Sequence, residues 1–159
     1  MQSDAATKAD RVVGGLAILA LVAGSVIIGT QRARYERFLY ISELGAVGFR
    51  SEEWFRWGFV LVVVGIALVG WVVRDVRSRG RVLDRWRPSV SLLLSAGWFL
   101  VASQVNCTDG CPAPTMPDAT VRDAVHISAA VLGFAAGAWA MLQLATATDR
   151  FMRRISAVG

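Results

Sequence analysis

The residues best suited to chemistry are one histidine and two acidic side chains. His126 is the single histidine of the chain, and it follows Asp123 by three residues. Positions i and i+3 of a helix share a face, so this carboxylate could orient or charge the imidazole. Glu43 lies within an apolar stretch of an earlier loop. We expect the three groups to converge on one outward-facing vestibule. Three further polar residues could line it: Gln104, Asn106 and Asp109.

A simpler role is open to the same residues. A polar group at the end of a membrane helix often serves only as a hydrogen-bonding anchor between helices. His126 and Glu43 could both act in this way. No residue is assigned as catalytic, and His126, Asp123 and Glu43 remain candidates only.

Two cysteines form a second candidate site. Cys107 and Cys111 are separated by Thr-Asp-Gly in a loop rich in proline and glycine. A disulfide across this short loop is expected if the loop faces an oxidising compartment. The alternatives are a metal site and free or partner-linked thiols, but a structural zinc site needs four ligands and the chain has one histidine. We expect a disulfide, and no metal or other cofactor.

The residue inventory excludes several enzyme classes. One histidine cannot provide two-histidine haem ligation or a histidine-rich membrane metallohydrolase site. Glycine-rich phosphate loops and nucleotide-binding fingerprints are missing. The centres of the apolar segments hold no ionisable residue, which argues against an ion pathway.

Four apolar segments must position these residues. Of the 159 residues, 55% are hydrophobic and 18% are charged. About 20 helical residues cross a bilayer core of about 30 Å, and backbone groups in lipid must pair within their own segment. The sequence therefore predicts an all-α fold, an integral membrane four-helix bundle in a single transmembrane domain over residues 1–159. The predicted spans are residues 12–29, 58–73, 90–105 and 127–145.

Basic residues are distributed unequally around these spans. The N-terminal tail, loop 74–89 and the C-terminal tail hold eleven of the 17 Lys and Arg residues. By the positive-inside rule, both termini and loop 74–89 are predicted to be cytoplasmic in a bacterial plasma membrane. Loops 30–57 and 106–126 are then outside. The net charge of +5 therefore reflects orientation and does not indicate nucleic-acid binding.

Loop 74–89 holds six of these basic residues. We interpret them as topology signals and lipid-headgroup contacts, or alternatively as a docking surface for an acidic partner. They are Arg74, Arg77, Arg79, Arg81, Arg85 and Arg87.

Residue spacing makes two further predictions. Loop 30–57 has apolar residues three and four apart among charged ones, which predicts an interfacial amphipathic segment or a cap over the bundle. Small residues four apart mark close helix packing: Gly133 and Gly137 in the fourth span, and Ser25 and Gly29 in the first. We favour packing within the chain for the first span and leave the partner of the fourth open.

Two motifs together resemble a known family. YISELGAVG follows the first span, and NCTDGCPAPT with the later DAVH precedes the fourth. This combination resembles domain-of-unknown-function family 998, bacterial multi-span membrane proteins distantly similar to the Frag/DRAM/Sfk proteins. The matching positions are Ile41, Ser42, Glu43, Leu44, Gly45 and Ala46, then Cys107, Asp109, Gly110, Cys111 and His126. The resemblance implies about six spans, so this chain looks like a four-span short form whose open faces a homo-oligomer or larger complex would cover.

These observations favour a small, non-enzymatic accessory or structural subunit of a membrane protein complex. The preference for Arg over Lys is typical of a high-GC, actinobacterial genome. The alternative is a lipid- or glycolipid-binding or -modifying protein with a site around Glu43, Asp123 and His126, suggested by analogy with the distant relatives. A third interpretation is a redox or metal sensor that uses Cys107 and Cys111. The expected partners are membrane lipids and other membrane subunits or further copies of the chain, not nucleic acid.

Overall fold

The computed structural model describes residues 2–147, and these residues fold into helices joined by loops. The four α-helices are α1 (Gln2–Ala33), α2 (Glu52–Val72), α3 (Pro88–Gln104) and α4 (Val121–Ala145). Two short 3-10 helices, η1 (Ile41–Gly45) and η2 (Leu83–Arg85), lie in the connections. Within residues 2–147 the one β-type pairing is an isolated bridge between Ser78 and Ala147. The all-α prediction is confirmed.

The helix starts follow from local sequence. Pro88 opens α3, where its missing N–H and fixed φ cost nothing. Thr120 caps α4: its side-chain oxygen accepts from the backbone N–H of Asp123, whose carboxylate accepts in return from the backbone N–H of Thr120. Each predicted apolar segment lies inside one of these helices or ends one residue beyond it.

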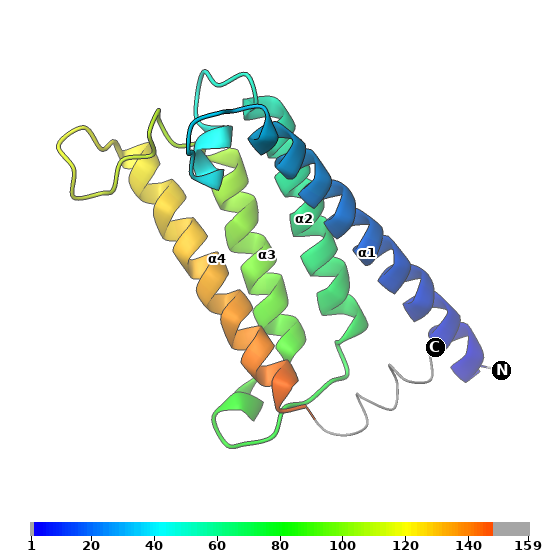
Figure 1. Cartoon of the computed structure of the whole chain (residues 1–159). Coiled ribbons are helices and arrows are strands. Elements are labelled where there is room, and N and C mark those ends of the chain that lie inside the picture. The colour runs from blue at the N-terminus through cyan, green and yellow to red at the C-terminus, as the bar shows by residue number, and fades with distance from the viewer. Residues whose placement is uncertain (1, 148–159) are drawn as a thin grey trace.

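The helices form an open bundle. α1 packs on α2, α2 on α3 and α3 on α4, so the helices stand side by side in chain order (Figure 1). α1 and α4 lie at the two edges of this row. The loops between α1 and α2 and between α3 and α4 share one end of the molecule, which we call the cap end. The loop between α2 and α3 lies at the other end, the base end, where α1 begins and α4 finishes (Figure 1).

Aromatic side chains connect three of the helices. Phe55 and Phe59 of α2 stack with ring centroids 5.6 Å apart, and Phe59 meets Phe99 of α3 edge to face at 5.6 Å. Phe99 in turn meets Phe134 of α4 at 4.9 Å. Stacked and edge-to-face contacts of this kind are the favoured arrangements of ring quadrupoles. They extend the core from the cap end across the bundle.

Glycines allow α4 to pack closely on α3. A Cβ at Gly133 of α4 would lie 2.7 Å from the ring of Phe99, and one at Gly137 would lie 3.2 Å from Oγ of Ser95. Ser95 also donates a 2.8 Å hydrogen bond to the carbonyl oxygen of Gly133. The Gly133–Gly137 face therefore packs on α3, which answers the question that the sequence left open.

The first span behaves differently from our expectation. Ser25 and Gly29 are exposed, and a Cβ at Gly29 would meet no atom within 4 Å. The close contact lies one residue earlier, at Gly24, where a Cβ would come within 2.5 Å of the carbonyl oxygen of Gly58 on α2. The prediction chose the wrong face of α1 because two faces carry small residues four apart: Ser25 and Gly29 on one, and Ala20 and Gly24 on the other.

The helices have the length and composition of membrane spans. Lys8–Ala33, Glu52–Val72 and Val121–Ala145 are each long and apolar enough to cross a bilayer. α3 is apolar but has 17 residues, about 25 Å of helix, which is shorter than a typical bilayer core. The chain is a small helical membrane protein.

Candidate functional site

The two loops at the cap end hold each other in place. The backbone N–H of Val47 donates to the carbonyl oxygen of Cys107 at 3.1 Å. The amide of Asn106 donates to the Glu52 carboxylate at 2.8 Å, and the other oxygen of Glu52 accepts from the N–H of Gly48. The Cys107 sulfur lies 3.8 Å from the carbonyl oxygen of Ser42. Segments about 60 residues apart in sequence are thus joined into one cap.

The first of these loops folds around its own short helix. Leu44 and Ala46 are fully buried, and Leu44 forms a core cluster with Leu39 and Phe55. The Glu43 carboxylate accepts a 2.6 Å hydrogen bond from the N–H of Tyr40 and so caps the start of η1. Ser51 donates to the carbonyl oxygen of Leu44 at 2.8 Å.

The amphipathic segment predicted in this loop is therefore mainly a cap. Only Ile41–Gly45 is helical, because the apolar residues turn inward onto α1 and α2 at η1 instead of following one continuous stripe. Phe38, Tyr40 and Ile41 stay exposed, and these three side chains are available to the membrane interface.

Asp123 anchors the second loop to α4. Its carboxylate is fully buried and accepts from the backbone N–H groups of Thr108 and Thr120 at 2.7 and 2.8 Å. It also accepts from both threonine hydroxyls, at 3.0 and 2.6 Å. These donors compensate the burial of a carboxylate, so we interpret Asp123 as a structural group.

His126 joins α4 to the end of α3. Its Nδ1 lies 2.9 Å from the carbonyl oxygen of Ala102 and 2.8 Å from that of Val105. Both partners are acceptors, so Nδ1 must carry the proton. The last carbonyl groups of a helix lack partners within the helix, and here one buried imidazole satisfies two of them.

The cysteines are brought together by a tight turn. The sulfurs of Cys107 and Cys111 lie at disulfide-bonding distance, with their Cα atoms 5.2 Å apart. Gly110 has a φ of +77° and Cys111 one of +44°, in the left-handed region that glycine adopts at little cost. The geometry is compatible with the expected disulfide, and Cys107 is fully buried beneath the first loop.

A scan of known families identifies the chain. The family model described as "Protein of unknown function (DUF998)" matches residues 12–159. The chain belongs to the DUF998 family. No curated protein and no solved structure gave a significant match. The resemblance drawn from the two motifs is thus confirmed at the level of the family.

The motif residues of this DUF998 chain converge on the cap. Within residues 8–147, no hydrogen bond links Glu43, Asp123 and His126 to one another, and each binds backbone groups instead. Gln104 and Asp109 are exposed, and the amide of Gln104 donates to the hydroxyl of its neighbour Ser103. Over the same residues, no group of three His, Cys, Asp or Glu side chains is placed to hold a metal ion.

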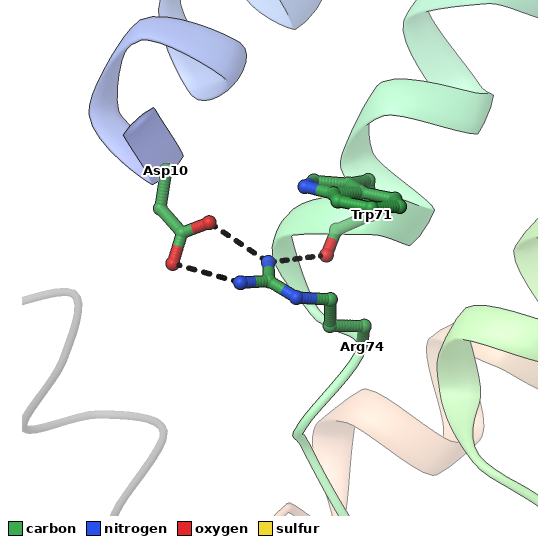
Figure 2. Close-up of polar contacts among 3 residues, drawn as sticks. All are labelled: Asp10, Trp71 and Arg74. Atoms are coloured by element: carbon green, nitrogen blue, oxygen red, sulfur yellow. Dashed lines mark hydrogen bonds and ion pairs between the residues drawn. The ribbon is translucent and has the colours of Figure 1, made fainter. Parts of the chain in front are cut away.

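The arginines of loop 74–89 lie at the base end and divide into two kinds. Arg74 donates to both carboxylate oxygens of Asp10 on α1, at 2.8 and 3.4 Å, and to the carbonyl oxygen of Trp71 at 2.9 Å (Figure 2). The hydrogen bond with Asp10 raises the pKa of Arg74 above its ordinary value. Arg87 donates to the carbonyl oxygen of Arg74 at 3.0 Å. This pair of arginines therefore has a structural role in linking the helices.

The other four arginines of the loop are exposed. Arg77 makes a long ion pair of 3.8 Å with the exposed Asp84. Such a pair contributes little to stability. For these four arginines, contact with lipid headgroups or with a partner remains a prediction. They are Arg77, Arg79, Arg81 and Arg85.

Gln143, the most buried polar residue of the base end, was not predicted from the sequence. Gln143 of α4 is fully buried and donates to the carbonyl oxygens of Leu83 and Trp86, at 2.9 and 2.8 Å. Its carbonyl oxygen accepts from Ser91 of α3 at 2.7 Å. The signal was present, since Gln143 is the one amide side chain within the fourth apolar segment.

Proposed function

We propose that this protein is a non-enzymatic accessory subunit that packs against another protein within the membrane. The polar residues of the family motifs are used to cap helices and join loops, and this use supports a structural role for them. The observation that carries the proposal is the uncovered face of α1, an edge helix with one extensive helix neighbour.

This face has the composition of a helix-packing surface. Ser25 and Gly29 are exposed on the side of α1 that points away from Gly24 and from α2. Lipid provides no hydrophobic force that gathers helices, and small residues four apart allow a second backbone to approach closely. Gly133 and Gly137 have the same spacing in α4, and there α3 covers them.

Photo-cross-linking tests the proposal. A photoreactive amino acid placed at Gly29 should give one stoichiometric adduct with a different membrane protein. The same amino acid at Ala23, which is also exposed on α1 but lies off the small-residue face, should not. Adducts with lipid only, or with a second copy of this chain, would contradict an accessory role.

The proposed orientation puts the base end in the cytoplasm and the cap end outside a bacterial plasma membrane. The excess of Lys and Arg around the base end supports this orientation. In unreduced protein with paired native cysteines, an impermeant maleimide should label D118C in intact cells. It should label R81C only after the membrane is permeabilised; both positions are exposed. The reverse pattern would invert the proposed topology.

A further inference from the structure

A hollow at the cap end lies between α1 and α2, away from the family motifs. It has a volume of about 310 Å³, near the lower limit for small-ligand sites. It opens beside the end of α1 and the first turn of α2, which holds the exposed Trp54. Five residues line it: Ile27, Thr30, Gln31, Arg34 and Trp54.

The polar groups of this hollow include donors without an acceptor. Gln31 is buried, with 6% of its surface exposed, and its carbonyl oxygen accepts a 3.3 Å hydrogen bond from Arg34. Among the described residues, the amide nitrogen of Gln31 donates to no partner, and the guanidinium of Arg34 forms no ion pair. The amide nitrogen of Gln31 and the guanidinium of the exposed Arg34 lie side by side and leave several N–H groups for an anion.

The remaining walls are suited to a lipid. Ile27 continues the hollow towards the apolar part of α1, and Trp54 supplies an indole of the kind enriched at the membrane interface. A guanidinium matches phosphate oxygens with two parallel donors. On the matrix or cytoplasmic side of membranes, basic pockets between helices bind phosphate-bearing lipid headgroups, and the same donor chemistry is present here.

We propose that this hollow binds the phosphate of an anionic phospholipid. Arg34 and the Gln31 amide donate to the phosphate oxygens, and an acyl chain follows Ile27 along the junction of α1 and α2. The phosphate neutralises the unpaired Arg34 charge. A zwitterionic lipid is less suitable, because its cationic headgroup would approach the same guanidinium.

The test compares two arginine variants in nanodiscs. R34Q removes the proposed phosphate contact, and R50Q removes the same charge from an exposed arginine of the same loop that does not line the hollow. Native mass spectrometry should find phosphatidylglycerol retained by the wild type and R50Q. R34Q should bind it about tenfold more weakly, the usual scale for a lost charged hydrogen bond.

Three other arms complete the test. Phosphatidylcholine should be retained less than phosphatidylglycerol, and millimolar inorganic phosphate should not displace the bound lipid. R34K, which keeps the charge without the two parallel donors, should bind with intermediate affinity. Equal loss of lipid in R34Q and R50Q would show general charge attraction and overturn the site. Displacement by free phosphate, or equal retention of both lipids, would overturn the assignment of an anionic phospholipid.

Discussion

At the residue scale, the polar side chains of the cap form hydrogen bonds with backbone groups. His126 offers Nδ1 to two carbonyl groups at the end of α3, and Asp123 receives donors from Thr108 and Thr120. Each of these groups is buried. Buried polar groups without partners are costly, so such contacts make the cap rigid and its residue types specific.

The role of His126 can be separated from acid–base chemistry by two substitutions. Asparagine places an N–H donor where the imidazole Nδ1 now lies, whereas leucine leaves both carbonyl groups without this partner. H126L should therefore lower the free energy of unfolding by about 1–3 kcal/mol, and H126N by clearly less. Thermal unfolding in detergent measures the difference. If asparagine is as damaging as leucine, the imidazole itself is required and the structural assignment is wrong.

The cysteine pair makes a second prediction at this scale. Unreduced, unfolded protein should take up no maleimide, and reduction should release two reactive thiols. The reason is that Cys107 and Cys111 lie at bonding distance in a tight turn. Closing so short a loop is worth about 2 kcal/mol, so reduction should also lower the melting temperature. Labelling of both cysteines without reductant would contradict the disulfide.

At the element scale, glycines allow α1 to approach α2 closely, and Gly24 has the tightest surroundings among them. G24A puts a methyl group against the carbonyl oxygen of Gly58, which cannot move aside as a flexible side chain could. Overpacking of this kind costs about 1–3 kcal/mol. G29A on the same helix meets no atom and serves as the matched control. Detergent melting curves should show a large loss for G24A and almost none for G29A; equal effects would contradict the observed helix interface.

The sequence predicted the helices far better than their contacts. Uninterrupted apolar segments and the lipid environment together require helices. The starts of α3 at Pro88 and of α4 after Thr120 lie before the predicted spans, which began at residues 90 and 127. The face through which a helix packs on its neighbour is harder to predict, because in lipid both sides of the helix are apolar. Gly24 and Ser25 differ by 100° around α1, and nothing in their types says which one meets α2.

The contacts of the candidate site were as hard to predict from the sequence as those between the helices. The close spacing of Cys107 and Cys111 predicted their pairing, whereas the Thr120–Asp123 capping box was not predicted. That Val47 would pair with the carbonyl of Cys107 could not be deduced, since the two loops approach each other only after four helices have packed. The polar residues were correctly placed at one end of the bundle, but their partners are backbone atoms, which carry no sequence signal.

At the scale of the whole molecule, the row of helices leaves α1 with one extensive neighbour. The proposed accessory role depends on a partner helix against Ser25 and Gly29. Leucine at these positions would keep that helix away. Both side chains are exposed in the single chain, so the S25L/G29L variant should fold normally.

Native mass spectrometry of the gently extracted protein tests this claim most directly. The wild type and the A23L control should carry a different membrane subunit at fixed stoichiometry. The S25L/G29L variant should be recovered without that subunit, with an unchanged melting temperature. Recovery of the wild type as a monomer, or of the variant still bound to its partner, would contradict the proposed function.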